Sequence, residues 1–526
     1  MKRTHSLIRW RRPFPIQLAV PAIIFACAVF TLSVLANDLD QIRTESFRDL
    51  VKRGDKLKRK GDLEAAEKAY RAAVAINPED ADVKLKLASA LLKQRRLREA
   101  YDLSYGVAEA DRQNAAAFAL LGTAMLAAGR FQDARALFYN ALKLDRKEAL
   151  AWAGYGMLDF YENRIESSLE NLWQAVFYDP DEPDYVFALA QVSSRAEKFK
   201  QAADSYYRFL EISKSEDDER RARIKGLINF LRFLGQKSGL YTLAGKNQTA
   251  VKFKLVGNRP VIQLRVNGGE EPLNFVLDTG SGISVISDST AKKIKIKPIT
   301  RGGFAKGIGG DGRFEIVYGF LKQIDVGEVK LRSVPVYIRK FHSDGQAIDG
   351  YIGLSLISKF LTTIDYGQQI FTLTKADNVQ PGTQVDDKIS LPLRLTTSGF
   401  LSGEVKLEGL TEPLNFIVDT GASVSVISDD VANMQAISGF ATPERMRVIG
   451  SAGVTDDVPS YLLPRVSFGS HSRRSVTAIA LNLDTINEAS GFQQAGILGG
   501  NFLRNYRMTF DFRNSKVTFV PLIADQ

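Results

Sequence analysis

The chain contains the stretch EPLNFVLDTGSGISVISD at residues 271–288 and a near copy, EPLNFIVDTGASVSVISD, at residues 412–429. The two copies agree at thirteen of eighteen positions without a gap. Other segments recur in the same order: GIGGDG at 307–312 with VIGSAG at 448–453, and YIGLSLI at 351–357 with ILGGNFL at 497–503. Apolar and polar residues alternate from Ala250 onward and glycine is frequent, which indicates β-strands. The sequence therefore predicts one β-rich unit that occurs twice.

Each copy places an aspartate, Asp278 or Asp419, between an apolar strand and a Thr-Gly turn. Burying an isolated carboxylate is costly, so this position needs a chemical reason. Glycine permits a tight turn, and the threonine hydroxyl can brace one loop against the other. Two such loops at a pseudo-twofold axis bring the carboxylates close enough to share one proton. One carboxylate then activates a water while the other polarises a carbonyl, which predicts hydrolysis of a peptide bond.

These motifs resemble the aspartic proteases of the pepsin and retropepsin group. The resemblance covers about residues 250–523 and rests on Asp-Thr-Gly-Ser at 278–281 and Asp-Thr-Gly-Ala at 419–422, each followed by a glycine-rich hairpin and an apolar-apolar-Gly segment. It implies an all-β fold of two lobes, a peptide or protein substrate and no cofactor or metal. The catalytic pair that it implies is Asp278 and Asp419.

The resemblance also assigns supporting roles around the two aspartates. The residues that would support the active site are Thr279, Gly280, Ser281, Thr420, Gly421 and Ala422. The residues that would form the flap tips over the substrate are Ile308, Gly309, Gly310, Ile449, Gly450 and Ser451, within segments 308–312 and 449–453. The segments that would pack behind the two loops are Ile352-Gly353 and Leu498-Gly499.

The sequence also departs from each branch of this group. Both lobes lie in one chain, as in pepsins, although both keep a glycine-rich flap of the retropepsin type and no tyrosine stands at the matching flap tip. Ala422 replaces the hydroxyl that Ser281 can offer to its aspartate. Less hydrogen bonding to the charged form leaves its pKa less depressed. We therefore expect activity to peak at mildly acidic to neutral pH, and a peak below about pH 3 would contradict this.

A regular repeat precedes the β-rich part, and its five units begin at residues 47, 81, 115, 149 and 183. Small residues share its eighth position: Gly54, Ala88, Gly122, Gly156 and Ala190. Mostly large residues share its twenty-fourth position: Tyr70, Ser104, Phe138, Leu172 and Tyr206. This period resembles the tetratricopeptide repeat, a helix-turn-helix unit that stacks into a curved solenoid. We expect the solenoid and its closing helix over residues 47–235, and a linker over residues 236–249.

The same resemblance implies that the solenoid binds a protein partner or substrate on its concave surface. A second interpretation is that the array is a spacer that holds the protease away from a membrane, and the two roles are compatible. The sequence does not identify the partner.

An apolar run without a charge occupies residues 16–36. A bilayer core takes about 20 helical residues, so a run of this length predicts a transmembrane anchor. The basic residues within 1–15 predict that this tail is cytoplasmic. A cleaved signal peptide is the alternative, because Val34-Leu35-Ala36 is an acceptable cleavage site. In both interpretations the main body of the protein is exported. For this combination of domains we expect the bacterial periplasm.

Rare residues exclude other chemistries. The single cysteine, Cys27, lies in the apolar run, which excludes a disulfide framework and a cysteine nucleophile. The three histidines, His5, His342 and His471, are not at ligand spacing, which argues against a histidine-built zinc site and a Ser-His-Asp triad. The net charge of +10 is small for 526 residues, and the sequence gives no reason to expect nucleic-acid binding.

The sequence thus predicts a multidomain protein with a transmembrane helix, an α-helical solenoid, a first protease lobe at 250–380 and a second at 381–526. The expected function is a membrane-anchored aspartic endopeptidase. The alternative is a catalytically inactive scaffold that grips a peptide in the same fold, but the two intact aspartates favour the enzyme. Self-processing within residues 236–249 is a third possibility.

Overall fold

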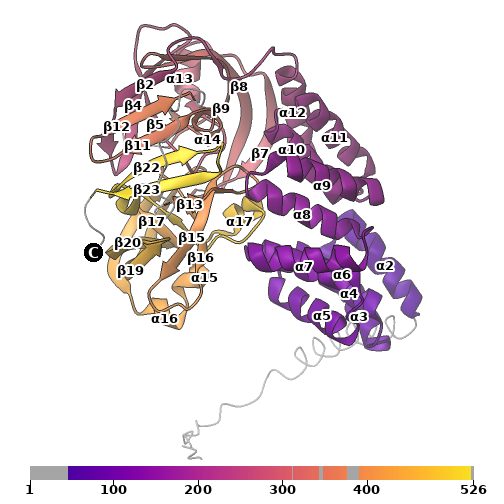
Figure 1. Cartoon of the computed structure of the whole chain (residues 1–526). Helices are drawn as coiled ribbons and strands as arrows, with labels where there is room; N and C mark the ends of the chain where they lie inside the picture. Colours follow the sequence, from indigo (N-terminus) through magenta and orange to yellow (C-terminus); the bar gives the residue numbers. More distant parts are fainter. Residues whose placement is uncertain (1–45, 311, 343–346, 376–389, 523–526) are drawn as a thin grey trace, which may run out of the picture.

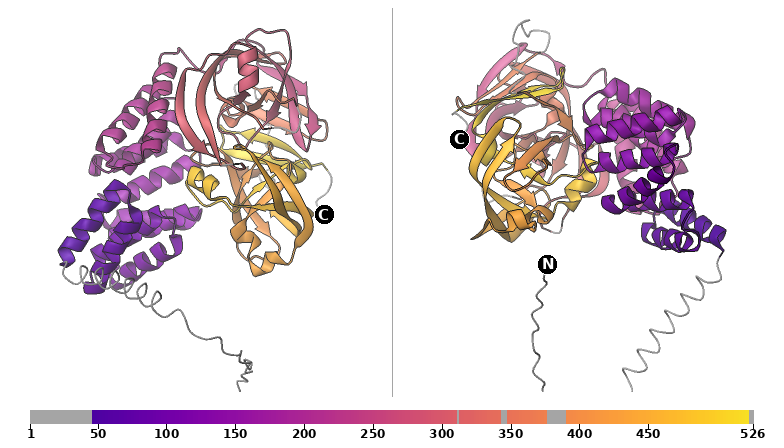
Figure 2. Two further views of the ribbon diagram at one scale, coloured as in Figure 1. Left: turned by 180° about the vertical axis from the view of Figure 1, so that it is seen from behind. Right: turned by 60° about the horizontal axis from the view of Figure 1, so that its bottom comes forward.

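The computed structural model describes residues 46–310, 312–342, 347–375 and 390–522 of the chain as a helical part followed by a β-rich part (Figure 1). The two parts lie side by side in each view (Figure 2). This order of a helical solenoid before a β-rich unit agrees with the predicted fold class. The apolar run at 16–36 lies outside the described residues. Among the residues described, no helix is both long and apolar enough to cross a membrane.

The helices form pairs, and the first helix of each pair begins at the residue where a repeat unit begins, as the sequence predicts. These first helices are α2 (Phe47–Lys60), α4 (Ala81–Lys93), α6 (Ala115–Ala127), α8 (Ala149–Tyr161) and α10 (Pro183–Arg195). The second helices are α3 (Leu63–Ile76), α5 (Leu97–Ala110), α7 (Phe131–Leu144), α9 (Ile165–Tyr178) and α11 (Phe199–Ile212). A last helix, α12 (Asp218–Leu234), follows them.

The small residue at the eighth repeat position has a packing reason. A Cβ atom at Gly54 would lie 2.5 Å from the ring of Tyr70, and one at Gly122 would lie 2.6 Å from the ring of Phe138. Both rings are fully buried. Glycine therefore lets the two helices of a repeat approach closely, with the large side chain of the twenty-fourth position between them.

The helical array curls until its two ends touch. Lys60, the last residue of α2, forms an ion pair with Glu216 after α11 at 2.8 Å, and the Glu216 amide donates to the Lys60 carbonyl at 3.2 Å. Lys93 of α4 pairs with Asp184 of α10 at 2.6 Å. Because α4 and α10 are first helices of different repeats, and such helices contact one another along the inside of the curve, this ion pair lies across the concave surface.

Each lobe of the β-rich part has one large sheet. The strands of the first are β1 (Thr242–Leu243), β3 (Lys254–Val256), β4 (Arg259–Val266), β5 (Leu273–Leu277), β6 (Val285–Ser287), β7 (Thr300–Lys306), β8 (Arg313–Val326), β9 (Val329–Arg339) and β10 (Gly350–Ile352). Those of the second are β14 (Arg394–Leu395), β15 (Leu401–Leu407), β16 (Leu414–Val418), β17 (Ser425–Ser428), β18 (Ala441–Ile449), β19 (Val454–Phe468), β20 (His471–Leu481) and β21 (Gly496–Leu498). The short helices are α13 (Asp288–Lys293), α14 (Leu354–Ile357), α15 (Asp429–Ala432), α16 (Gln435–Ser438), α17 (Asp484–Ser490) and α18 (Gly500–Leu503).

The two lobes share one pairing pattern. Strand β10 runs parallel to β5 and antiparallel to β6, and β21 runs parallel to β16 and antiparallel to β17. The internal sequence repeat is therefore a repeat of topology, with the two aspartates following the equivalent strands β5 and β16.

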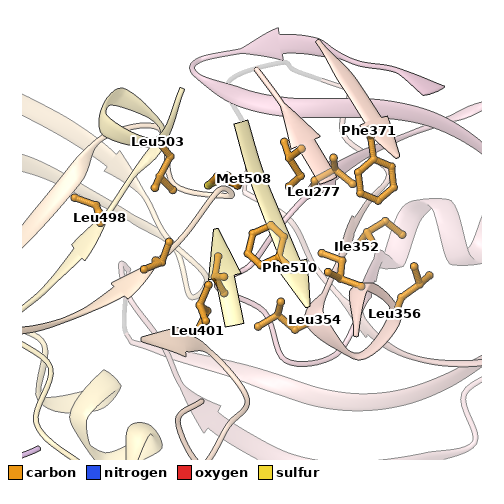
Figure 3. Close-up of a cluster of buried hydrophobic side chains, with 14 of the residues drawn as sticks. Leu277, Ile352, Leu354, Leu356, Phe371, Leu401, Leu498, Leu503, Met508 and Phe510 are labelled. Carbon is orange, nitrogen blue, oxygen red and sulfur yellow. The ribbon is translucent and has the colours of Figure 1, made fainter. Parts of the chain in front are cut away.

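A third sheet joins the lobes. Its strands, in spatial order, are β13 (Ser390–Pro392), β23 (Lys516–Pro521), β22 (Tyr506–Asp511), β11 (Leu361–Asp365), β12 (Ile370–Thr374) and β2 (Gln248–Lys252). Beneath the aspartate loops one hydrophobic core spans both lobes, and Phe510 of β22 lies among Leu277, Ile352 and Leu354 of the first lobe (Figure 3). Burying this apolar surface holds the lobes together.

The structure differs from the expectation of a linker at residues 236–249. Part of this segment forms β1, which pairs with β9, and the beginning of β2, which pairs with β12. Leu240 and Leu243 also pack against the core of the β-rich part. Sheet hydrogen bonds and apolar burial thus hold this segment against the first lobe.

The turns inside four successive repeats contact the β-rich part. These turns share a residue with positive φ at the same repeat position: Arg95, Gly129, Asn163 and Glu197. Arg95 Nη1 donates to the Asn487 carbonyl at 3.1 Å, and Asn163 Nδ2 donates to the Phe512 carbonyl at 3.1 Å. Glu197 forms an ion pair with Lys359. One edge of the solenoid is therefore bound to both lobes.

Helix α12 packs on the hairpin of β7 and β8 (Figure 1). A Cβ atom at Gly226 would lie 2.4 Å from the carbonyl oxygen of Arg301 in β7. The ring of Phe230 stacks on Tyr318 of β8, with ring centroids 4.5 Å apart. The close approach of α12 to the sheet thus depends on a glycine in the middle of a helix.

This contact predicts opposite effects of the same substitution at two helical glycines. Gly226→Ala should lower the stability of the full chain by about 1–3 kcal/mol, because backbone atoms must shift to admit the methyl group. Gly106→Ala in α5 is the matched control, since its Cβ would meet nothing within 4 Å. It should stabilise the chain by about 0.5–1 kcal/mol through helix propensity. Calorimetric Tm values of both variants check this, and an unchanged or raised Tm for Gly226→Ala would contradict it.

Candidate active site

The structure brings Asp278 and Asp419 together at the ends of β5 and β16. The strand behind each loop sets its position: the Asp278 amide donates to the Ile352 carbonyl at 3.0 Å, and the Asp419 amide donates to the Leu498 carbonyl at 3.0 Å. Each of these carbonyls belongs to the last residue of β10 or β21, directly before a glycine. The apolar-apolar-Gly segments therefore lie behind the aspartate loops, where the resemblance places them.

The two threonines tie the loops to each other through reciprocal hydrogen bonds. The Thr279 hydroxyl donates to the Val418 carbonyl at 2.6 Å, and the Thr420 hydroxyl donates to the Leu277 carbonyl at 2.7 Å. Each hydroxyl also accepts a bond of 3.1 Å from the amide of the other threonine. Both threonines are fully buried, so this network fixes the distance between the loops.

The glycines after the threonines leave room for the opposite carboxylate. A Cβ atom at Gly280 would lie 2.4 Å from Cγ of Asp419, and one at Gly421 would lie 2.7 Å from Cγ of Asp278. No side chain fits at either position while both carboxylates keep their places.

The hydrogen bonds to the two carboxylates are unequal. Asp278 accepts from the Gly280 amide at 2.9 Å and from the Ser281 hydroxyl at 2.7 Å. Asp419 accepts from the Gly421 amide at 2.7 Å, and the Ala422 amide also stabilises its charged form, but Ala422 supplies no hydroxyl. The two aspartate side chains also interact directly with each other, and this interaction lowers the pKa of Asp278 and raises that of Asp419.

These contacts give the two carboxyl groups different acidities. Burial, and then the charge of Asp278, raise the pKa of Asp419 well above its ordinary value. Burial also raises the pKa of Asp278, but the Ser281 hydroxyl, the bond to Asp419 and the Gly280 amide oppose the rise. The arrangement therefore favours a proton on Asp419 and a negative charge on Asp278.

The two flap hairpins, β7 with β8 and β18 with β19, meet at their tips. The Gly310 amide donates to the Val454 carbonyl at 3.1 Å, and the Ala452 amide donates to the Ile308 carbonyl at 2.8 Å. The Ile308 amide donates to the Ser451 hydroxyl at 3.2 Å. Close backbone contacts at Gly309 and Gly450 join the same two tips, and Ile449 ends β18 beside them. All six residues assigned to the flap tips are therefore brought together.

The first flap reaches the opposite lobe beside the active site. Ile308 packs in one apolar cluster with Ala422, three residues after Asp419, and with Ile497 of β21. This contact places the flap tip over the second aspartate loop.

The structure adds residues that the sequence pattern does not single out. Arg339, the last residue of β9, acts electrostatically on Asp278, and its guanidinium lies 4.7 Å from the ring centre of Phe314 in β8. Tyr351 interacts electrostatically with both aspartates, and burial raises its pKa. Comparing the two copies by strand register would have indicated both positions, because the second lobe carries aliphatic residues there. No cluster of three or more His, Cys, Asp or Glu residues suited to a metal ion occurs in the described part of the chain.

Known families and structures match both parts of the chain. A model of the aspartyl protease family matches residues 262–356 and 403–502, and a TPR repeat model matches residues 54–94. No curated protein matches the sequence. A thermophilic TPR protein of Thermus thermophilus is 19% identical with a TM-score of 0.31, and the match covers 35% of this chain and 99% of that one.

Two other solved structures give similar figures. PilF of Pseudomonas aeruginosa is 15% identical with a TM-score of 0.27, covering 36% of this chain and 85% of that one. MamA of Desulfovibrio magneticus RS-1 is 19% identical with a TM-score of 0.23, covering 33% and 97%. The family matches agree with the site geometry and the helix pairs. This chain therefore carries an aspartyl protease domain, over residues 262–502, behind a tetratricopeptide repeat.

Proposed function

We propose that the chain is an aspartic endopeptidase that hydrolyses peptide bonds through Asp278, Asp419 and an activated water. One observation carries this proposal: the reciprocal threonine bonds hold two buried carboxylates together, and the two groups differ in their other hydrogen bonds. Burying two carboxylates costs folding free energy. Such buried pairs with shifted pKa values cluster at functional sites.

The unequal hydrogen bonds assign a role to each carboxyl group. Charged Asp278 takes a proton from the water as its oxygen attacks the carbonyl carbon of the substrate, and Asp419 gives its proton to the carbonyl oxygen. A neutral tetrahedral intermediate results. Asp278 then gives the proton that it took from the water to the leaving nitrogen, and Asp419 recovers its proton from a hydroxyl of the intermediate. The C–N bond breaks, and one acid and one amine are released.

The closed flaps support the same proposal. An extended peptide beneath the flaps would form main-chain hydrogen bonds with strand edges on both sides. Hydrogen bonds of this kind bind an extended peptide independently of its side chains. The flaps also exclude bulk water from the pair, which strengthens every electrostatic interaction in the site.

We further propose that the helical array docks a protein, either the substrate or a partner. Tetratricopeptide repeats mediate contacts between proteins. The expected concave surface is crossed by the Lys93–Asp184 ion pair. The outer helices instead expose an aromatic residue at one repeat position, by 48%, 61%, 50% and 51%: Tyr105, Tyr139, Trp173 and Tyr207. Aromatic residues of this kind are enriched in protein interfaces.

The location of the enzyme is also a proposal. The apolar run at 16–36 and the basic residues before it motivate a membrane anchor with the main body outside the cytoplasm. A reporter enzyme fused after Gln526 should be active only in the extracytoplasmic space. Activity confined to the cytoplasm would contradict this placement.

Removing either carboxylate should abolish hydrolysis. Asp278→Asn and Asp419→Asn should each lower kcat by at least about 10³-fold, because each removes one half of the acid–base pair. The measurement is cleavage of a diverse peptide library by the full chain between about pH 3 and pH 8. Asp430→Asn, at an exposed aspartate of the second lobe, is the matched control and should retain the wild-type rate. A folded Asp→Asn variant of the pair that still cleaves would overturn the mechanism.

Exchanging the residues at the two equivalent positions should move opposite limbs of the pH profile. Ser281→Ala removes a hydrogen bond to charged Asp278, so the pKa of Asp278 rises and the acidic limb moves up by about one pH unit. Ala422→Ser adds a donor beside Asp419, so the pKa of Asp419 falls and the basic limb moves down by a similar amount. The profile of kcat/KM against pH checks both shifts. If Ser281→Ala moved the basic limb and Ala422→Ser moved the acidic limb, the roles of the two aspartates would be exchanged.

A further inference from the structure

The pseudo-twofold axis relates the residues on the two sides of the aspartate pair to each other, and each side is called a wall below. In the first lobe Ser287 is paired with Arg339, and in the second lobe Ser428 is paired with Leu481. Ser287 and Ser428 stand at the same place in the duplicated stretch. Arg339 and Leu481 therefore occupy equivalent positions, but the first side chain is cationic and the second is apolar.

Two further pairs of positions differ in the same sense. Tyr351 is equivalent to Ile497, because each is paired with the corresponding valine of its copy. Arg259 is equivalent to Phe400, because each has the same place on the strand before the aspartate strand. The first lobe thus has two cations and a phenol where the second has three hydrocarbon side chains.

The wall of the second lobe is continuous and apolar. Phe400, Leu481 and Ile497 belong to one cluster with Ile308 of the first flap and Ala422 beside the second aspartate loop. Such a surface suits an aliphatic or aromatic side chain of a substrate.

The wall of the first lobe has a cation without an anion. Arg339 Nε is buried and has no hydrogen-bond partner. Within the described part of the chain, no carboxylate forms an ion pair with Arg339. Its guanidinium lies over Phe314 of the first flap hairpin, and its charge reaches Asp278 and Tyr351. Asp278 already accepts hydrogen bonds from Ser281 and Gly280, so it does not serve as the partner.

A guanidinium whose Nε is buried without a hydrogen-bond partner is costly until an acceptor binds it. Its planar fork matches the two oxygens of a carboxylate, and water exclusion beneath the flaps strengthens such a pair. The aromatic rings of Phe314, Tyr351 and Phe341, the last two with centroids 5.1 Å apart, bound this part of the wall.

We propose that the first-lobe half of the cleft binds an acidic side chain of the substrate through Arg339, and that the second-lobe half binds an apolar side chain on the other side of the scissile bond. This inference rests on the proposed function, because it names the class of peptide that the same site takes. Glu or Asp on one side and a hydrocarbon residue on the other is the expected substrate pattern.

Arg339 could instead act only by tuning the charge of Asp278, and the two roles predict different results. A specificity role changes the ratio of kcat/KM between acidic and neutral peptides. A tuning role lowers cleavage of both peptides alike and moves the acidic limb of the profile to higher pH.

The experiment uses a peptide library and a twin library in which every Glu is replaced by Gln. The full chain should prefer the Glu member of a pair by about tenfold to a hundredfold in kcat/KM, the effect of a hydrogen bond to a charged group. Arg339→Leu, which reproduces the second-lobe residue, should remove this preference, so that the Glu and Gln members of a pair are cleaved with equal kcat/KM. Arg339→Lys should keep part of the preference. Arg332→Leu, at an exposed arginine of the same strand, is the matched control and should change neither.

A binding measurement separates this inference from the proposed catalysis. The full chain carrying Asp419→Asn is titrated with fluorescent members of both libraries, with and without Arg339→Leu. If Glu peptides bind more tightly than Gln peptides and Arg339→Leu removes this difference, the inference is supported. This holds even if the wild-type chain cleaves no peptide, a result that would contradict only the proposed function. Equal binding of both libraries, no binding of either, or a preference that survives Arg339→Leu would overturn it.

Discussion

The reciprocal bonds of Thr279 and Thr420 are the constraint on which the β-rich part depends. Two carboxylates repel each other, and burial without solvent adds to the cost. The threonine hydroxyls prevent the loops from separating because each is bonded to the backbone of the opposite lobe. The shared core and the six-stranded sheet keep the lobes in place behind these bonds. The close approach of the two aspartates is therefore a consequence of contacts made elsewhere in the two lobes.

Duplication within one chain lets the two halves of this site differ. In an assembly of two identical chains, a change in one half necessarily appears in the other. Here Ser281 faces Asp278, whereas Ala422 stands beside Asp419, and Arg339 stands where the other copy has Leu481. The chemistry of the pair and the chemistry of the walls have thus diverged while the strand pairing has not.

The sequence predicted most of what depends on local pattern. The doubled Asp-Thr-Gly stretch indicated the fold and the pair, and the regular spacing of small and large residues indicated the helix pairs, because sterics and glycine permissiveness act over short stretches of chain. It did not predict the contact between Arg95 and Asn487, which are 392 residues apart, since nothing in either segment marks the other as a neighbour. Residues 236–249 were interpreted as a linker because strands as short as β1 leave no periodicity.

The attachment of α12 to β7 and β8 makes the two flaps mechanically unequal. In the described part of the chain, no hydrogen bond or ion pair joins β18 or β19 to the helices, whereas Arg223 Nη1 donates to the Phe304 carbonyl of β7 at 3.1 Å and Arg313 pairs with Glu219 at 2.6 Å. Lifting the first flap alone breaks these contacts and the Phe230–Tyr318 stack. Lifting the second breaks none of them. The first flap is therefore attached to the helical repeats and the second is not. A displacement of the repeats would be transmitted to the active site through the first flap.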